Sequence, residues 1–221
     1  MMDLKEEKDE KDISKAVIDR LPRYYRYLGD LCDEGVERIS SKELSIIMGV
    51  TASQIRQDLN HFGGFGQQGY GYNVEFLRDE IGKLLGLDKK HNLVIIGAGN
   101  LGRAIANYMN FEKRGFIIKG IFDIDESIIG TKIRDIKVLP LSEVEDFIKK
   151  NDIDIGVLTI PRGPAVKTAE LLVSCGIRAI WNFAHVDLSV PEGVLVENVH
   201  LSDSLMKLSY NCNRRDNYGK G

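Results

Sequence analysis

A G-x-G-x-x-G motif follows a short apolar run in Leu93-Val94-Ile95-Ile96-Gly97-Ala98-Gly99-Asn100-Leu101-Gly102. The apolar run predicts a buried strand and the motif then opens a helix, which is the context in which this glycine spacing binds a dinucleotide. Gly97 permits the tight turn, Gly99 lets the backbone approach a pyrophosphate, and Gly102 lets helix and strand pack closely. Free N–H groups at the helix start then face the phosphates. We therefore predict that residues 97–102 bind the diphosphate of a dinucleotide.

Strand and helix patterns alternate around this motif from residue 91 to residue 200. Further strands are predicted at residues 116–122, 137–139, 153–159 and 178–182, and helices from the glycine motif to Gly115 and over residues 142–150 and 164–175. This order predicts a parallel sheet covered on both faces. Residues 91–200 are therefore predicted to form a Rossmann-like α/β domain, and an amphipathic helix over residues 203–211 follows it.

A carboxylate after the second predicted strand indicates which dinucleotide binds. Asp123 lies 21 residues after Gly102, where it would accept hydrogen bonds from the adenosine ribose and repel a 2′-phosphate, so NAD(H) is favoured over NADP(H). Asp125 is interpreted as an exposed turn residue. The residues at the ends of the later parallel strands are expected to lie beside the nicotinamide. The alternative is that these residues only end strands and form turns. With Asp123, the candidate contacts are Ile124, Thr159, Ile160, Pro161, Asn182, Phe183 and Ala184.

Two short helices in the N-terminal part of the chain form a helix-turn-helix pattern. Ser40 and Thr51 each begin a capping box, with Glu43 and Gln54 three residues later. The first helix of the pair is predicted to end at Gly49. In this pattern the second helix lies in the major groove of DNA and reads base edges.

Glycines and aromatics over residues 63–72 predict a hairpin with Gln67-Gln68-Gly69 at its tip. A helix capped by Asn73 follows, and the linker Asp88-Lys89-Lys90 separates it from the first strand of the α/β domain. A helix-turn-helix followed by a hairpin is a winged helix. Residues 13–86 are therefore predicted to form a winged-helix domain.

The polar face of the second helix supplies candidate base readers, since Arg suits guanine and Asn or Gln suits adenine. Asp58 is an exception on this helix, and we expect it to pair with Arg56 or a neighbouring basic residue. The candidate DNA contacts are Ser41, Lys42, Thr51, Ser53, Gln54, Arg56, Gln57, Asn60, His61, Gln67, Gln68 and Tyr70.

The charge of the chain at first argues against a nucleic-acid partner. The 221 residues carry a formal net charge of −3, whereas DNA binders are usually basic. However, residues 1–12 hold six acids and three lysines and account for that whole charge, and we interpret them as a flexible tail. Residues 38–70 hold three basic residues against two acids. DNA binding is therefore expected to rely on few phosphate contacts and on two protomers acting together.

The remaining composition predicts a cytoplasmic protein without a metal or a membrane partner. The charged N-terminus does not resemble a signal peptide, and no run approaches the roughly 18 apolar residues of a membrane helix. Cys32, Cys175 and Cys212 show neither Cys-x-x-Cys pairing nor zinc spacing. We interpret them as reduced thiols.

Motifs over roughly residues 14–210 identify a family. They are Ile39-Ser40-Ser41-Lys42-Glu43-Leu44, Gln54-Ile55-Arg56, Asp58-Leu59, Phe62-Gly63, Gly69-Tyr70-Gly71-Tyr72, the glycine motif 97–102, Phe111-Glu112-Lys113-Arg114-Gly115-Phe116, Phe122-Asp123, Asn182-Phe183-Ala184 and Glu197-Asn198-Val199. In these stretches the chain closely resembles the Rex family of bacterial redox-sensing transcriptional repressors. The resemblance implies a homodimer that exchanges its C-terminal helix, here within residues 201–221. It also implies that NADH releases operator DNA, while NAD⁺ competes and permits DNA binding.

The resemblance further implies how the two domains are coupled. Tyr108 and Arg26 fall at positions that link the cofactor pocket to the DNA-binding domain, and Tyr108 is also a candidate cofactor contact. Members usually have Asp where this chain has His200; an Asp there could pair with Arg26 across the dimer, and Asp203 is the alternative partner here. His185 replaces a frequent proline. Other departures reduce the positive charge of the DNA face, at Gln57, Asn60-His61 and Gln67-Gln68.

Three functions remain to be separated. The first is a non-enzymatic repressor that binds NADH and NAD⁺ as regulatory ligands and operator double-stranded DNA as its partner. The second is an NAD-dependent dehydrogenase with an attached helix-turn-helix module, which would need His185 or His200 as a general acid or base. The third is a repressor that senses another adenine ligand. We predict the first.

Overall fold

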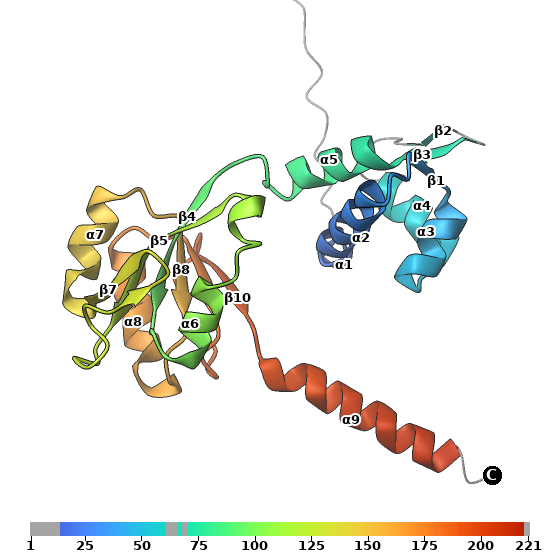
Figure 1. Cartoon of the computed structure of the whole chain (residues 1–221). Helices are drawn as coiled ribbons and strands as arrows, with labels where there is room; N and C mark the ends of the chain where they lie inside the picture. Colours follow the sequence, from blue (N-terminus) through green and yellow to red (C-terminus); the bar gives the residue numbers. More distant parts are fainter. Residues whose placement is uncertain (1–13, 61–65, 68–69, 219–221) are drawn as a thin grey trace, which may run out of the picture. The chain divides into compact units, whose positions relative to one another are not determined.

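The computed structural model describes residues 14–60, 66–67 and 70–218. By its internal contacts the chain divides into two units, Met1–Asp88 and Lys89–Gly221 (Figure 1). The N-terminal unit combines helices with a small sheet, whereas the second unit is built around a larger one. Each unit has buried apolar residues of its own.

The N-terminal unit is helical, with three short strands in its described part. In chain order its elements are α1 (Lys15–Ile18), α2 (Leu21–Asp33), β1 (Arg38–Ile39), α3 (Ser41–Met48), α4 (Ala52–Asn60), β2 (Gly66–Gln67), β3 (Gly71–Asn73) and α5 (Val74–Leu84). The apolar faces of the helices share one core, in which Tyr24, Leu28 and Leu44 are fully buried. Helices α3 and α4 form the predicted helix-turn-helix (Figure 1).

Capping decides where the helix-turn-helix pair begins and ends. At Ser40 the predicted capping box is present, because Ser40 Oγ accepts a hydrogen bond from Glu43 N (3.1 Å) and Glu43 Oε2 accepts one from Ser40 N (2.8 Å). Gly49 ends α3 with a φ of +64°, a left-handed conformation that suits glycine. At Thr51 only half of the predicted box forms. Thr51 Oγ1 accepts a bond from Gln54 N (3.1 Å), but the Gln54 side chain bonds elsewhere.

The predicted hairpin is part of an antiparallel sheet in the order β1-β3-β2. Gln67 pairs with Gly71, so the predicted tip falls at residues 68–69, which lie outside the described residues. Gly71 has a φ of +71°, and a Cβ there would lie 2.6 Å from the carbonyl oxygen of Ile39. The sequence pattern does not predict β1, because two residues are too few to show an alternation.

Asp58 pairs with a basic residue, but the partner is Arg20, 38 positions away in the chain, and not Arg56. Its side chain is fully buried and accepts two hydrogen bonds from Arg20, at 2.7 Å from Nε and 2.7 Å from Nη2. The Tyr24 hydroxyl donates a third (2.9 Å) and Gln54 Nε2 a fourth (2.7 Å). Burial opposes ionisation of Asp58, but the bonds from Arg20, Gln54 and Tyr24 outweigh it and lower the pKa of Asp58. This network fixes the middle of α4 to the start of α2.

The second unit contains a seven-stranded sheet in the order β10-β9-β8-β4-β5-β7-β6. Its strands are β4 (His91–Ile96), β5 (Phe116–Asp123), β6 (Lys132–Ile133), β7 (Ile136–Pro140), β8 (Ile155–Leu158), β9 (Ala179–Asn182) and β10 (Leu195–Asn198). Only the β6–β7 pair is antiparallel. The predicted Rossmann-like parallel sheet is therefore confirmed, with the short edge strands β6 and β10 added to it.

The helices of this unit differ in length from the prediction. They are α6 (Asn100–Ala106), α7 (Val144–Lys150), α8 (Arg162–Ser174) and α9 (Leu201–Tyr218), with 3-10 turns η1 (Glu112–Arg114) and η2 (Leu141–Glu143). The helix after the glycine motif ends at Ala106, not at Gly115, because the Asn107 side chain bonds the Arg103 carbonyl (2.8 Å) and Tyr108 N turns back to Ile105 O (3.1 Å). Gly115 ends η1 instead, with a φ of +84°.

Side chains of β4 alternate between two cores, as the pleat of a strand requires. Leu93 and Ile95 pack with α6, whereas Val94 and Ile96 pack with α7 and α8. An apolar cavity of about 310 Å³ lies on the same face of the sheet as Leu93. Its lining residues are Leu93, Phe111, Phe116, Ile155, Ala179, Ile180, Trp181, Leu195 and Glu197.

Replacing Asp58 is expected to loosen α4. Asp58→Asn leaves Arg20 without its carboxylate, and removing one partner of a buried ion pair lowers the free energy of unfolding. We expect a loss of about 3 kcal/mol, at the low end of the range for buried pairs, because Arg20 is 27% exposed. Urea denaturation followed by circular dichroism measures the loss. The control is Glu80→Gln, which removes only a surface contact with Lys83 and should leave the free energy of unfolding unchanged. Equal stability of the two variants would contradict the anchoring role of Asp58.

The same variant predicts a pH dependence. Because the pKa of Asp58 is lower folded than unfolded, its contribution is complete above the ordinary Asp value of about 3.9 and is lost as pH falls through the folded value. The stability difference between wild type and Asp58→Asn should therefore stay constant from about pH 7 to pH 5 and shrink below about pH 4. A difference that grows on acidification would show that the pKa of Asp58 is raised instead.

Candidate functional site

A cleft of about 270 Å³ opens at the carboxyl ends of β4, β5 and β8. Strand order reverses between β4 and β8, and this is the switch point at which open α/β sheets bind ligands. Seven predicted cofactor contacts line the cleft, namely Gly97, Gly99, Asp123, Ile124, Thr159, Ile160 and Pro161. The structure therefore brings together residues that lie up to 64 positions apart in the sequence.

The three glycines of the motif have different surroundings. Gly97 has a φ of +104°, and a Cβ there would lie 2.8 Å from both Ile160 Cγ2 and the Thr159 carbonyl oxygen. A Cβ on Gly102 would lie only 1.9 Å from the Gly97 carbonyl oxygen. A Cβ on Gly99, in contrast, would meet no atom within 4 Å. Gly97 and Gly102 are thus required by the fold, whereas the space over Gly99 is free for a ligand.

Asp123 holds the glycine turn against the end of β5. Its Oδ2 accepts a hydrogen bond from Ala98 N (2.5 Å), and its Oδ1 accepts bonds from Ile124 N (2.7 Å) and Asp125 N (2.9 Å). Two carboxylate oxygens have about four acceptor positions, so capacity remains for a ligand hydroxyl. Thr159 supports the turn from the other side, since its hydroxyl bonds the Gly97 carbonyl (2.8 Å).

Several predicted cofactor contacts do not line this cleft. Ala98 is buried in the turn, and Asn100, Leu101 and Gly102 begin α6, where Asn100 is exposed, Leu101 packs into the core and Gly102 is buried. Asn182 ends β9 and Phe183 and Ala184 follow it, while Tyr108 follows α6 and is 47% exposed. These residues are placed around the cleft strands but not in the cleft itself.

Part of the cleft wall was not predicted from the sequence. The additional lining residues are Ile96, Ile128, Leu141, Pro164 and Thr168. Asp125, for which a turn role was favoured over a role beside Asp123, also lines the cleft, and it caps a turn by accepting bonds from Ser127 N (2.9 Å) and Oγ (2.7 Å). The apolar Ile124 and Ile128, in an otherwise polar segment after a strand end, are the signal that could have indicated this wall.

The loop after β9 is fixed by one buried amide. Asn182 Nδ2 donates hydrogen bonds to the Val186 carbonyl (2.9 Å) and to Asn198 Oδ1 (2.8 Å), and its Oδ1 accepts one from Ala184 N (3.0 Å). These bonds tie the ends of β9 and β10 together. His185 and His200 stack there, with centroids 5.9 Å apart and an interplanar angle of 16°. Neither ring lines the cleft.

The candidate DNA contacts occupy the exposed part of the helix-turn-helix. Thr51, Ser53, Arg56, Gln57 and Asn60 are exposed on or beside α4, and Lys42 is exposed near the start of α3. Gln54 is half-buried because it donates to Asp58. Tyr70 is 70% exposed at the wing. His61, Gln68 and the side chain of Gln67 lie outside the described residues.

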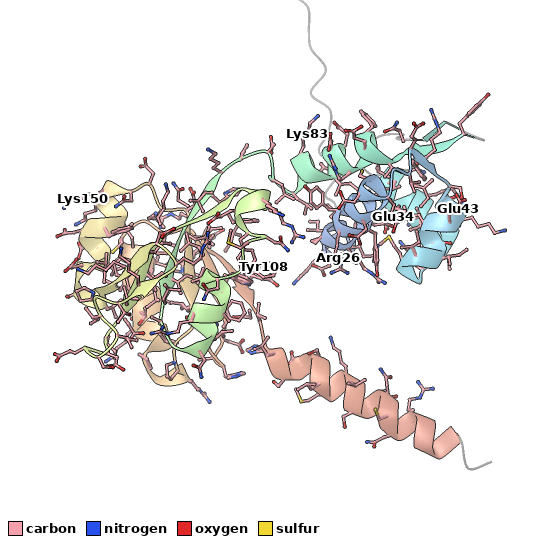
Figure 2. The ribbon with its side chains drawn as sticks, in the orientation of Figure 1. Arg26, Glu34, Glu43, Lys83, Tyr108 and Lys150 are labelled. Atoms are coloured by element: carbon pink, nitrogen blue, oxygen red, sulfur yellow. The ribbon has the colours of Figure 1, made fainter. Side chains whose placement is uncertain are left out.

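Both acids of residues 38–70 are engaged within the unit. Asp58 is buried against Arg20, and Glu43 bonds the backbone of Ser40, which lowers the pKa of Glu43 (Figure 2 labels this residue). Arg56 Nη1 bonds Ser41 Oγ (3.1 Å), which joins α4 to α3. Arg38, absent from the predicted contacts, donates to the Tyr70 carbonyl at the wing (3.3 Å). Of the two acids, Asp58 is therefore withdrawn from the surface, whereas Glu43 stays exposed and ionised.

The predicted coupling residues are accessible in their own units. Arg26 lies on α2 with its guanidinium 5.3 Å from the centre of the Tyr27 ring, and with Arg23 it lowers the pKa of Tyr27. Asp203 is exposed on α9, where its N–H bonds the His200 carbonyl (3.1 Å). Figure 2 labels Arg26 and Tyr108 in their respective units.

Membrane and metal features were also sought in the described part of the chain. None of its helices has the length and apolar character needed to span a bilayer. Among the same residues, no group of three or more His, Cys, Asp or Glu side chains is arranged to hold a metal ion.

Family models and solved structures match both units. Residues 12–60 match the model described as "Putative DNA-binding protein N-terminus", and residues 88–186 match the "CoA binding domain". A structure of RSP in complex with β-NAD⁺ and operator DNA matches with a TM-score of 0.88 at 62% identity, covering 94% of this chain and 96% of that one. A structure of RSP with β-NADH also has a TM-score of 0.88, at 58% identity, covering 95% and 99%.

A curated relative agrees over nearly the whole length. The chain is 62% identical over 208 residues to the redox-sensing transcriptional repressor Rex of Thermoanaerobacter sp. (strain X514), covering 94% of this chain and 93% of that protein. RSP is itself described as a Rex-family repressor. On this agreement, the chain belongs to the Rex family of redox-sensing transcriptional repressors.

Proposed function

We propose that this chain is a DNA-binding repressor that senses the ratio of NADH to NAD⁺, and that it releases operator DNA when NADH binds. The observation that carries the proposal is the open space over Gly99 at the switch-point cleft, in a chain that also exposes a helix-turn-helix. The RSP complexes with β-NAD⁺, β-NADH and operator DNA support it. The dinucleotide acts as a signal and need not react, so the chain is a regulator rather than a dehydrogenase.

The cofactor is proposed to lie across the carboxyl ends of the strands. Its diphosphate would rest over Gly99, and an adenosine ribose would bond Asp123. The adenine would then contact the apolar wall of Ile124, Ile128 and Leu141. The carboxylates of Asp123 and Asp125 both border this cleft, so a 2′-phosphate would meet negative charge and NADP(H) is disfavoured.

Discrimination between NADH and NAD⁺ is proposed at the nicotinamide end, beyond β9. The dihydronicotinamide of NADH is neutral, whereas the ring of NAD⁺ is charged and is costly to place among apolar side chains. The half-buried ring of Phe183 offers an apolar surface there. Tyr108 and Arg26, with His200 or Asp203, are proposed to pass the difference to the DNA-binding unit.

On DNA, α4 is proposed to enter the major groove. Ser53, Arg56, Gln57 and Asn60 would approach base edges, while Lys42 and Arg38 would face phosphates. Two such helices must be spaced by one turn of DNA, about 34–36 Å, so binding requires a dimer. NADH can shift this arrangement only if it binds the DNA-incompetent state more tightly.

Because operator and dinucleotide occur together in the bacterial cytoplasm, we propose that the chain acts there.

The dimer is proposed to form by exchange of α9. Leu201, Leu205 and Leu208 recur at helical spacing and are 57%, 67% and 57% exposed, which an isolated helix in water does not favour. Such a stripe is suited to burial against a second copy.

Operator binding tests the proposal directly. With an operator duplex recognised by a Rex relative, we expect the chain to bind in the presence of NAD⁺ and to lose at least roughly tenfold in affinity with NADH, within the usual range of allosteric coupling. Gel shifts at fixed salt measure this, with NADPH and ATP as competitors. Release by ATP rather than NADH would support a sensor of another adenine ligand, and no operator binding under any condition would contradict the repressor proposal.

The glycine motif offers a matched pair of variants. Gly99→Ala places a methyl group in free space in this chain, so stability should change by less than about 1 kcal/mol, while NADH affinity falls at least roughly tenfold because the methyl group meets the diphosphate. Gly102→Ala cannot be accommodated beside the Gly97 carbonyl and should lower the melting temperature. Calorimetric titration and thermal unfolding measure the two effects. Wild-type NADH affinity in Gly99→Ala would place the diphosphate elsewhere.

The proposed exchange of α9 can be tested by introducing charge into its apolar stripe. Leu205→Glu with Leu208→Glu introduces two carboxylates into the apolar stripe, and we expect the chain to become monomeric and to lose operator binding. Analytical ultracentrifugation and gel shifts measure both. The control is Asn211→Glu, since Asn211 lies outside the stripe and is exposed; it should remain dimeric. A dimer that survives the double substitution would exclude α9 as its main contact.

A further inference from the structure

Four aromatic rings of the second unit form a continuous row, here called the aromatic row. The rings of Tyr108 and Phe111 are 4.8 Å apart between centroids, those of Phe111 and Trp181 are 5.6 Å apart, and those of Trp181 and Phe183 are 4.6 Å apart. All three contacts are edge-to-face, with interplanar angles of 64°, 85° and 62°. This geometry is favourable and directional, so each ring constrains the orientation of the next.

The two ends of the aromatic row lie at different functional positions. Phe183 directly follows β9 and precedes the loop that Asn182 fixes to Asn198. Trp181 and Phe183 are two residues apart, so they project to the same face of the sheet. At the other end, Tyr108 lies in the segment between α6 and η1 and is 47% exposed. The row thus connects the proposed nicotinamide end to the proposed coupling tyrosine.

The segment that carries Tyr108 is held on either side of that residue by one arginine. Arg134 Nη1 bonds the carbonyl of Ala106 (3.4 Å) and forms an ion pair with Glu112 (2.8 Å). Arg134 adopts a φ of +54°, which is uncommon for a residue other than glycine. With Ala106 and Glu112 fixed, the Tyr108 side chain between them packs against the ring of Phe111, and its hydroxyl accepts a hydrogen bond from Asn110 Nδ2 (3.3 Å).

The middle of the row has room to move. Phe111 and Trp181 both line the apolar cavity of about 310 Å³. Most protein interiors are close-packed, so a side chain there has no second position without displacing its neighbours. The apolar cavity beside these two edge-to-face rings removes that restriction. Phe111 and Trp181 can therefore repack without opening the sheet.

We propose that Phe111 and Trp181 are positioning residues that make the place of Tyr108 depend on the redox state of the bound nicotinamide. This inference rests on the proposed function, since it assumes that NADH weakens operator binding. The nicotinamide contacts or displaces Phe183, and the tilt of Phe183 moves Trp181 toward or away from the apolar cavity. Phe111 follows Trp181, and its new position shifts the ring of Tyr108. The aromatic row has two arrangements, and the bound cofactor changes their relative populations, as coupling between two sites requires.

The test is the coupling ratio, defined as the operator dissociation constant with saturating NADH divided by that with saturating NAD⁺. Trp181→Leu and Phe111→Leu each break the row, and we expect the ratio to fall roughly tenfold toward one. NADH affinity without DNA, and operator affinity with NAD⁺, should stay within about threefold of wild type. Trp181→Phe keeps an aromatic edge-to-face contact and should restore most of the ratio. Fluorescence anisotropy with a labelled operator measures the two operator dissociation constants, and calorimetric titration without DNA measures the NADH affinity.

A matched control lies on the opposite face of the same sheet. Phe147 and Phe122 are also edge-to-face, with centroids 5.3 Å apart and an interplanar angle of 79°. Phe147→Leu removes an aromatic pair of the same kind outside the aromatic row, so it is compared with Trp181→Leu for thermal stability and should keep the wild-type ratio. Phe111→Leu serves as the independent test if Trp181→Leu does not fold.

Two failures can be told apart. If wild type binds operator and NADH releases it, but Trp181→Leu and Phe111→Leu keep the wild-type ratio, the aromatic row has no positioning role. An equal fall of the ratio in Phe147→Leu would overturn the inference too, because the effect would then be a general loss of packing. If NADH does not release wild type, the proposed function fails, and the inference fails with it.

Discussion

The close approach of α6 to β4 is the constraint on which the second unit depends. Gly102 packs so tightly on the turn that a Cβ would lie 1.9 Å from the Gly97 carbonyl oxygen, and Gly97 itself has a φ of +104°. Asp123 and Thr159 hold the turn from both sides. Gly99 then lies at the cleft, where a Cβ would meet no protein atom within 4 Å.

A comparable anchor organises the N-terminal unit. Asp58 receives four hydrogen bonds from three side chains, which fixes the recognition helix while leaving its outer face free. Because Asp58 is buried against Arg20, it does not oppose the few cations of the helix-turn-helix at the surface. The net charge of −3 therefore says little about DNA binding, which depends on the placement of a few charges and on dimer geometry.

Local rules of sequence predicted much of this arrangement. Features that neighbouring residues determine could be predicted: the glycine motif, Asp123, the Ser40 capping box, and the alternation of strands and helices. Partners distant in sequence could not be predicted: local reasoning offered Arg56 or a neighbouring basic residue as the partner of Asp58 but did not identify Arg20, which lies 38 residues away. The contribution of Pro164 to the wall of the cleft likewise depends on contacts that no local pattern contains. The aromatic row requires strand register as well.

The central claim is that operator and NADH select opposite states of one molecule. Thermodynamic linkage then requires reciprocity: the factor by which NADH weakens operator binding must equal the factor by which operator weakens NADH binding. Calorimetric titration of NADH into the free chain and into its operator complex measures this directly. We predict weaker NADH binding in the presence of operator, by the same factor as in the reverse experiment. An NADH affinity that operator does not change would contradict the account.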